Sequence, residues 1–144
     1  MESCMRKVHF SYGHRLTDKG SKCSTLHGHN AVAEIYVTSV DKDNTIKDKV
    51  IDFSIIKEII GGWIDKHWDH TTILSSQDTL TIELLSRVPQ EKPIFILDTN
   101  PTAEAMARYL LHTVCPKELL GTGVACYKVV LWETQNCCAE ATIL

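Results

Sequence analysis

The chain has 144 residues, a length typical of one domain around a single core, so we expect one domain over residues 1–144. Hydrophobic residues make up 44% of the chain and charged residues 23%, which excludes the disordered and fibrous classes and indicates a packed globular protein. The formal net charge is -3, so there is no basic excess to neutralise a phosphate backbone, and nucleic acid is not an expected partner.

Apolar runs in the sequence are a few residues long, far short of the roughly 20 residues that span a bilayer, and the first residues lack the apolar core of a signal peptide. We therefore predict no membrane partner and a cytoplasmic location. The six cysteines are scattered and include no Cys-x-x-Cys pair, which argues against a disulfide framework and against a four-cysteine zinc site. Any metal site must depend on histidine.

Two strands and a helix are predicted in the first half of the chain. Residues 7–12 and 31–40 have alternating or β-branched patterns, which predict two antiparallel strands. Asp52 is suited to cap a helix whose apolar residues recur at spacings of three and four. These residues are Ile55, Ile56, Ile59, Ile60, Trp63 and Ile64. Gly61 and Gly62 are expected to weaken its later turns.

The second half of the chain suggests a helix between two strands. The short apolar segment 94–97 suits a strand, and residues 124–134 suit a final long strand. The helix between them is expected to begin with Asn100 or Thr102 as its cap and to end at Pro116. This order predicts an α+β domain with a four-stranded antiparallel sheet and two helices on one face.

A candidate metal site lies in the segment around His27 and His29. Side chains two residues apart point to the same face of an extended segment, so these two imidazoles can converge on one ion. A catalytic zinc ion needs a third protein ligand and keeps one open position, and His14 at the end of the preceding strand is a suitable third ligand. The alternative is that these histidines are ordinary loop or surface residues, because a His-x-His pair often occurs by chance.

Three further groups have side chains suited to proton transfer or binding. Cys23 lies in a polar loop four residues before His27, where a nearby cation would favour its thiolate, although an inert cysteine is the alternative. Asp69 and His70 form an acid–base candidate on weak spacing evidence. Glu133 ends an apolar strand, so it is either an exposed strand end or a paired carboxylate able to accept two N–H bonds from a pterin or guanine edge.

Six ordered segments together resemble the 6-pyruvoyltetrahydropterin synthase superfamily, in particular its 6-carboxytetrahydropterin synthase branch. The segments are Phe10–Leu16, Cys23–Asn30, Ile51–Phe53, Trp68–His70, Pro101–Glu104 and Leu131–Thr134. The resemblance implies the tunnelling fold, or T-fold, in which sheets from several subunits join into a barrel. It therefore implies a homo-oligomer, trimer-based and possibly a hexamer, with the active site between subunits.

The resemblance also implies roles for individual residues. His14, His27 and His29 would hold Zn²⁺, and Cys23 would be a general base assisted by Asp69 and His70. Glu133 would anchor the pterin of the substrate. The match at Thr102 and Glu104 implies two further substrate contacts.

The short gap between Cys23 and His27 favours the carboxy-forming branch. That branch converts 7,8-dihydroneopterin triphosphate to 6-carboxy-5,6,7,8-tetrahydropterin, releasing acetaldehyde and triphosphate, on the route to 7-deazaguanines such as queuosine. One alternative is the same fold making 6-pyruvoyltetrahydropterin for biopterin synthesis. Alternatives from other classes are a non-catalytic oligomeric protein with structural zinc and a nucleotide-binding regulatory module, although the chain lacks a Gly-rich phosphate loop.

Overall fold

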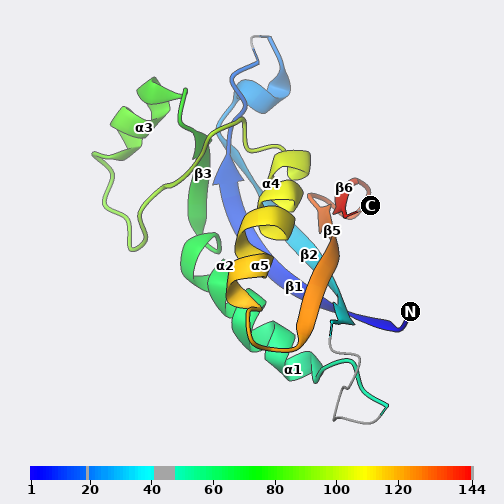
Figure 1. Cartoon of the computed structure of the whole chain (residues 1–144). Coiled ribbons are helices and arrows are strands. Elements are labelled where there is room, and N and C mark those ends of the chain that lie inside the picture. Colours follow the sequence, from blue (N-terminus) through cyan, green and yellow to red (C-terminus); the bar gives the residue numbers. More distant parts are fainter. Residues whose placement is uncertain (19, 41–47, 144) are drawn as a thin grey trace.

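Strands β1 (Ser3–His14) and β2 (His27–Ser39) form an antiparallel pair along their whole length, as predicted. Alternate residues of both strands are apolar, so one face of the pair is buried, with Phe10 on β1 and Ala33 and Ile35 on β2. The computed structural model describes residues 1–18, 20–40 and 48–143, and this pair is the centre of its sheet (Figure 1).

Further strands extend the sheet on both sides of this pair. On one side, β5 (Val124–Trp132) pairs antiparallel with β2, and β6 (Cys138–Thr142) pairs antiparallel with β5. On the other side, β3 (Thr71–Ser75) runs parallel to the end of β1, and β4 (Phe95–Leu97) runs parallel to β3. The strand order is β4-β3-β1-β2-β5-β6.

The predicted four-stranded antiparallel sheet is therefore wrong in strand number and in direction, because the sheet has six strands and is mixed. The two missed strands are short. β3 follows the first helix almost directly, and β6 consists largely of alanine and polar residues, which have little intrinsic preference for strands. The short α3 (Thr79–Leu85), capped by Asp78, was also not predicted; it connects β3 to the parallel β4.

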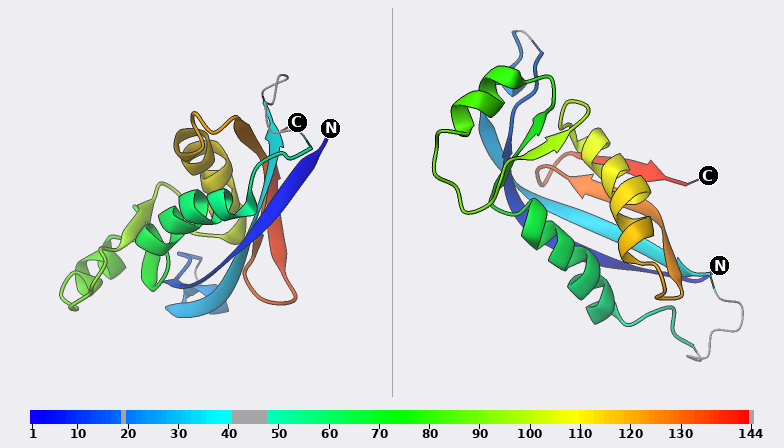
Figure 2. Two further views of the ribbon diagram at one scale, coloured as in Figure 1. Left: turned by 90° about the horizontal axis from the view of Figure 1, so that it is seen from below. Right: turned by 60° about the vertical axis from the view of Figure 1, so that its left-hand side comes forward.

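Two long helical segments cover the buried face of the sheet, as predicted (Figure 2). The first comprises α1 (Phe53–Ile56), a π-helical turn at Lys57–Gly61 and α2 (Gly62–His67), and the side chain of Asp52 caps it. The predicted weakness at Gly61 and Gly62 coincides with the end of the π-helical turn, but the helix continues past both residues.

The second helical segment comprises α4 (Ala103–Tyr109), a π-helical turn at Leu110–Val114 and α5 (Cys115–Glu118). Thr102 rather than Asn100 is its cap. The prediction that Pro116 ends the helix is wrong, because helical structure continues to Glu118. Pro116 is the second residue of α5, and one residue separates it from the end of the π-helical turn at Leu110–Val114, so the irregular hydrogen bonding of the helix coincides with the proline that lacks an N–H.

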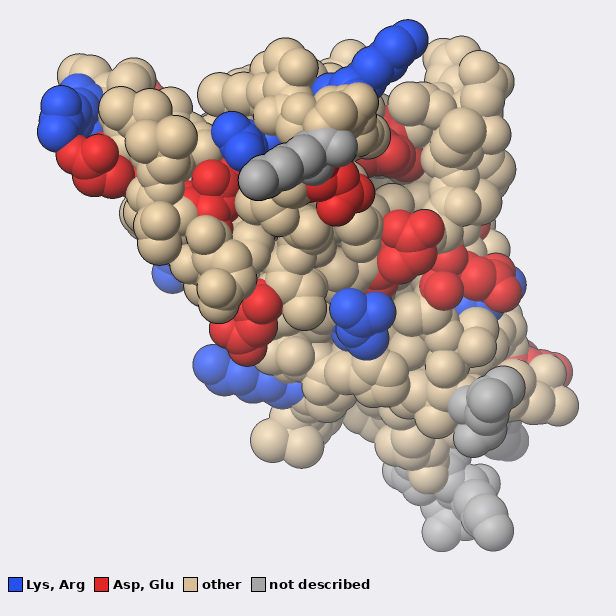
Figure 3. Space-filling view, turned by 90° about the horizontal axis from the view of Figure 1, so that it is seen from above, with Lys and Arg blue, Asp and Glu red and all other residues tan. Residues whose placement is uncertain are grey.

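Basic and acidic side chains are interspersed on the face shown in Figure 3. Among the described residues on that face there is no continuous basic stripe of the kind that binds a nucleic-acid backbone. Within the described ranges, no helix combines the length and apolar character needed to cross a membrane.

Candidate metal centre

The register of β1 and β2 brings the three predicted ligand residues together. His14 pairs with His27, and Tyr12 pairs with His29, so their side chains share the helix-covered face at one end of the strands. Gly28 lies between the two β2 histidines. A Cβ atom added at Gly28 would be 3.0 Å from the carbonyl oxygen of Tyr12, so glycine permits the close approach of the two strands here.

The three imidazoles converge closely enough to share one ion. One ligand nitrogen from each of His14, His27 and His29 lies within 4.8 Å of the others. The Nε2 atoms of His14 and His27 are 3.1 Å apart. A set of three histidines is suited to Zn²⁺, with room for a fourth, non-protein ligand.

Hydrogen bonds at the opposite ring nitrogens orient two of these imidazoles. His14 Nδ1 lies 2.7 Å from the carbonyl oxygen of Pro101, and His27 Nδ1 lies 2.5 Å from that of Thr25. A carbonyl oxygen only accepts, so each Nδ1 carries a proton, and in the neutral form of each ring it is Nε2 that presents the lone pair. Backbone carbonyls commonly orient metal-ligating histidines in this way.

The burial of the cluster also fits a metal ion. Burial lowers the pKa of His14 and of His29, which favours the neutral form that binds metals. His29 Nε2 is buried without a hydrogen-bond partner in the structure, a condition that a bound ion would relieve. The residues present therefore fit a divalent metal at this position.

Glu133 lies against this cluster. It directly follows β5, and its Oε1 is 3.3 Å from Nε2 of both His14 and His29. Tyr12 donates a long hydrogen bond of 3.4 Å to the same oxygen. The interpretation of Glu133 as a simple exposed strand end is therefore wrong, because its carboxylate is partly buried and accepts the hydrogen bond from Tyr12.

Cys23 is exposed on a 3-10 turn, η1 (Lys22–Ser24). Its carbonyl oxygen accepts a hydrogen bond of 2.8 Å from the amide of Leu16, two residues after His14. The hydroxyl of Ser21 accepts a hydrogen bond from the Cys23 amide. These two hydrogen bonds fix the backbone of Cys23 beside the end of β1 that carries the histidine cluster. Cys115 and Cys126, in contrast, are buried in the core, where a substrate cannot reach them.

Asp69 and His70 are paired with each other but not with the histidine cluster. Asp69 Oδ2 is 2.9 Å from His70 Nδ1, and Asp69 Oδ1 accepts a hydrogen bond from the amide of Ser11. Burial alone would raise the pKa of Asp69, but these hydrogen bonds outweigh it and lower the pKa below the usual aspartate range. In the described part of the chain no hydrogen bond or ion pair joins this pair to the three histidines.

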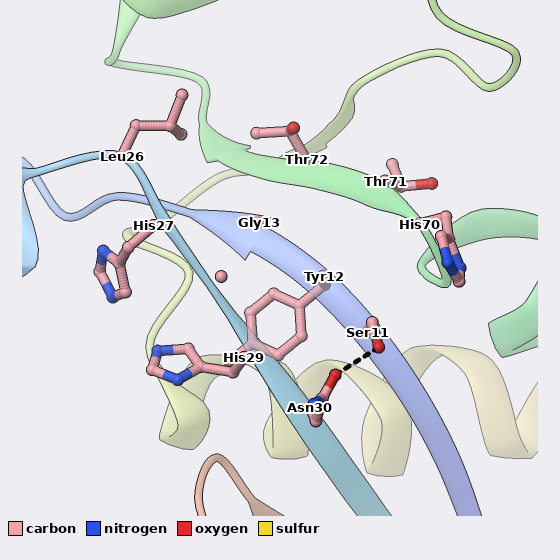
Figure 4. Close-up of a pocket in the computed structure, with 11 residues that line it drawn as sticks. Ser11, Tyr12, Gly13, Leu26, His27, His29, Asn30, His70, Thr71 and Thr72 are labelled. Atoms are coloured by element: carbon pink, nitrogen blue, oxygen red, sulfur yellow. Dashed lines mark hydrogen bonds between the residues drawn. The ribbon is translucent and has the colours of Figure 1, made fainter.

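An open cavity of about 500 Å³ extends along the ends of β1, β2 and β3, and His70 borders it on one side (Figure 4). His27 and His29 border it on the other side through strand β2, with their imidazoles turned toward the opposite, helix-covered face of the sheet. Ser11 and Asn30, which are hydrogen-bonded to each other, line it between these groups. A cavity of this size can hold a small heterocyclic ligand.

Thr102 and Glu104, the two other predicted contact residues, lie at the start of α4. The hydroxyl of Thr102 accepts a hydrogen bond of 3.1 Å from the amide of Ala105, so its first role is to cap the helix. Glu104 is exposed in the first turn. The adjoining Pro101 is the residue whose carbonyl orients His14.

Tyr12 is the residue at this site to which sequence reasoning assigned no role. It is 3% exposed, and its ring contacts the imidazoles of His14 and His29. The alternation along β1 was a usable signal, because a residue two positions before His14 must share its face. The carbonyls of Thr25 and Pro101 could not have been found from side-chain type.

Comparisons with known proteins identify the family that the chain resembles. Residues 3–143 match the family described as 6-pyruvoyl tetrahydropterin synthase. A Rickettsia felis protein named 6-carboxy-5,6,7,8-tetrahydropterin synthase is 35% identical over 97% of this chain and 99% of its own. The protein of that name from Aquifex aeolicus is 35% identical over 83% of this chain and 75% of its own.

Solved structures show the same fold. An uncharacterized protein from Wolinella succinogenes superposes with a TM-score of 0.80 at 20% identity, covering 99% of this chain and 98% of the other. The 6-pyruvoyl tetrahydropterin synthase of Plasmodium falciparum superposes with a TM-score of 0.64 at 22% identity, covering 98% of this chain and 99% of the other. Because the family match spans nearly the whole described sequence, the chain belongs to the 6-pyruvoyl tetrahydropterin synthase family.

Proposed function

We propose that this protein is a zinc-dependent 6-carboxy-5,6,7,8-tetrahydropterin synthase. The observation that carries the proposal is the three-histidine centre with its Nε2 atoms turned inward, in a chain 35% identical to the named Rickettsia felis enzyme. The reaction consumes 7,8-dihydroneopterin triphosphate and one water, and yields 6-carboxy-5,6,7,8-tetrahydropterin, acetaldehyde and triphosphate. The pteridine ring gains the hydrogen that the side chain loses, so no external reductant is required.

In this proposal His14, His27 and His29 hold the ion, and the carbonyls of Pro101 and Thr25 keep two of the rings in the ligating tautomer. When bound, zinc would polarise the side-chain hydroxyls of the substrate and lower their pKa. The neutral imidazoles leave the full charge of the ion available for this purpose.

Proton transfer is assigned to Cys23, Asp69 and His70. The Cys23 thiolate takes a proton from a side-chain carbon of the substrate, and its exposure leaves it accessible for this step. Asp69 orients His70 through their 2.9 Å hydrogen bond and stabilises its cationic form, so His70 can exchange a proton with a side-chain oxygen.

Substrate binding is assigned chiefly to Glu133, whose carboxylate is suited to the amino and ring N–H groups of the pterin. Its contact with Tyr12 fixes one oxygen. Thr102 and Glu104 are proposed as additional contacts at the start of α4, where the Thr102 hydroxyl hydrogen remains available for donation.

The proposal includes a homo-oligomer, with a trimeric barrel or a hexamer as the expected form and the active site between subunits. β1 pairs with β3 only at Tyr12–His14, and the outward groups of Ser11 bond to Asp69 and His70, so among the described residues the outward peptide groups of β1 before Ser11 form an open edge. β6 is the opposite edge of the sheet. His70 lies beside the open edge, because its amide donates to the carbonyl of Ser11, so a neighbouring subunit could bring its own histidine cluster to it.

A cytoplasmic enzyme of this kind would supply its product to the synthesis of 7-deazaguanines such as queuosine.

Product analysis tests the chemistry directly. Zinc-loaded protein is incubated with 7,8-dihydroneopterin triphosphate, and the products are identified by mass spectrometry. We expect 6-carboxytetrahydropterin and acetaldehyde from the wild type and neither from Cys23→Ala.

Cys4→Ala is the matched control, because Cys4 lies ten residues before His14 on the same strand, roughly 33 Å away along an extended chain. It should retain activity. A 6-pyruvoyl product would reassign the protein to the other branch of the family. Absence of turnover in zinc-loaded protein would support a non-catalytic role instead.

A further inference from the structure

The backbone of His70 is held in an unfavourable conformation. Its φ is 55°, in the left-handed region that residues with a Cβ atom rarely adopt. Such conformations persist only where surrounding contacts fix them, and they are concentrated at functional sites. The contacts that fix His70 can be identified in this structure.

The peptide bond between Asp69 and His70 is held at both of its polar ends. At one end, the His70 amide donates a hydrogen bond of 2.6 Å to the carbonyl of Ser11 on β1. At the other end, the carbonyl oxygen of Asp69 accepts a hydrogen bond of 2.7 Å from Nζ of Lys92. Rotation of this peptide plane would break both bonds.

Lys92 also holds the end of the preceding helix. The amide of Asp69 donates to the carbonyl of Ile64, so it is not available to the carbonyl of Asp65 near the end of α2. Lys92 Nζ supplies the missing donor, 2.5 Å from that carbonyl oxygen. One ammonium group, on a loop distant in sequence, therefore joins the helix end to the strained turn.

We propose that Lys92 is a positioning residue for the Asp69–His70 pair. It fixes the peptide plane between them and so aims the imidazole of His70 into the cavity that His70 borders. The inference rests on the proposed function, in which His70 exchanges a proton with substrate. Lys92 itself does not line this cavity and acts through His70.

The test compares Lys92→Met, Lys92→Arg and Lys66→Met. Methionine keeps the length of the side chain but removes the donor, whereas the guanidinium of arginine can donate to two carbonyls. Lys66 is exposed on α2, the helix whose end Lys92 contacts, so Lys66→Met removes one positive charge nearby without removing the donor to the turn. All measurements are made well below the unfolding midpoint of each variant.

The first readout is amide hydrogen exchange, which needs no substrate. In Lys92→Met the His70 amide should exchange at least about tenfold faster, while the amide of Ile35 in the central β2 keeps its wild-type rate. Lys92→Arg should restore slow exchange, and Lys66→Met should not alter it. Wild-type exchange at His70 in Lys92→Met would overturn the proposal.

The second readout is steady-state kinetics. We expect kcat of Lys92→Met to fall about 10- to 100-fold with KM little changed, because a misplaced acid–base group slows proton transfer. Lys92→Arg should recover most of this loss. If Lys92→Met destabilises the protein but retains wild-type kcat, Lys92 has a structural role only and the proposal is wrong.

The two readouts separate this inference from the proposed function. Faster His70 exchange in Lys92→Met, in a protein whose wild type makes no pterin product, would support the anchoring of the turn and refute the proposed reaction. If Lys92→Met makes the pterin product with the kcat of the wild type, the proposed reaction is supported and the positioning role of Lys92 is refuted.

Discussion

Tyr12 connects the histidine cluster to Glu133. Its ring lies 5.1 Å from the ring of His14 and 5.8 Å from that of His29, measured between centroids, and its hydroxyl donates to Glu133. Burial, with the nearby Glu133 carboxylate, raises the pKa of Tyr12, so the hydroxyl remains a donor at neutral pH. This hydroxyl fixes a carboxylate to which we assign substrate binding.

Removing that hydroxyl should therefore weaken substrate binding. In Tyr12→Phe, where the ring remains, we expect KM to rise roughly 3- to 10-fold with a smaller change in kcat and unchanged zinc content. Tyr36→Phe is the control, because Tyr36 donates to Glu34 on the other face of the sheet. An unchanged KM in Tyr12→Phe would contradict the role given to this contact.

Loss of one imidazole should remove most of the metal. His27→Ala is expected to lower zinc content well below one ion per chain after dialysis, because three protein ligands become two. Inductively coupled plasma mass spectrometry provides the measurement. His9→Ala, an exposed histidine on the same strand pair, should retain full zinc, and equal content in both variants would disprove the ligand assignment.

At the scale of elements, α4 supports the metal centre through its first turn. Thr102 caps the helix, and Pro101 directly before it orients His14. We expect Thr102→Ala to lower the free energy of unfolding by about 1 kcal/mol and also to weaken zinc binding. Urea unfolding and zinc titration test this, with the exposed Thr113→Ala as control; equal stability of the two variants would contradict the capping role.

The turn after α2 should make stability depend on pH through Asp69. Although burial alone would raise the pKa of this carboxyl, hydrogen bonds from Ser11 and His70 hold it below the ordinary value of about 3.9. A carboxyl whose pKa is lower in the folded state stabilises that state at pH values above its ordinary pKa. This contribution is lost as the pH falls through the pKa of the folded state.

Wild type should therefore lose stability below about pH 4 more steeply than Asp69→Asn does. Urea unfolding measured from pH 3 to pH 7 tests this expectation. Asp65→Asn should follow the wild-type curve, since the side chain of Asp65 is exposed on the adjoining helix. Parallel curves for wild type and Asp69→Asn would show that the carboxylate does not contribute.

The sequence was sufficient for elements whose patterns are long. Strand alternation, the Asp52 cap and the apolar spacing of both helices located β1, β2, β5 and the two long helical segments. It was insufficient for β3 and β6, which are strands because of the neighbours they pair with. The histidine cluster followed from spacing and family motifs, whereas the role of Lys92 depends on backbone carbonyls brought together by tertiary structure.

At the scale of the whole molecule, the open edge of β1 makes assembly testable. The amide and carbonyl of Ser11 point away from β2 toward Asp69 and His70, so the peptide groups of Lys7, four residues earlier, point to the same edge. Proline at position 7 removes only an outward N–H, which an edge strand tolerates but an edge joined to a second subunit does not.

We therefore expect Lys7→Pro to be folded but monomeric, and to lose turnover, whereas Lys7→Ala remains oligomeric. Light scattering coupled to size exclusion gives the mass, and circular dichroism checks the fold. A monomeric wild type, or an oligomeric Lys7→Pro variant, would refute pairing through this edge.

His14 and His27 form the innermost residue pair of the β1–β2 hairpin, and the connection that bears Cys23 begins directly after one and ends directly before the other. An ion bound to both would act as a cross-link at the base of that connection, in the same sense as a disulfide that closes a loop. Metal binding would therefore add a further restraint to the connection that carries Cys23. Loss of the ion would then loosen the loop of the proposed base as well as remove the charge that activates the substrate.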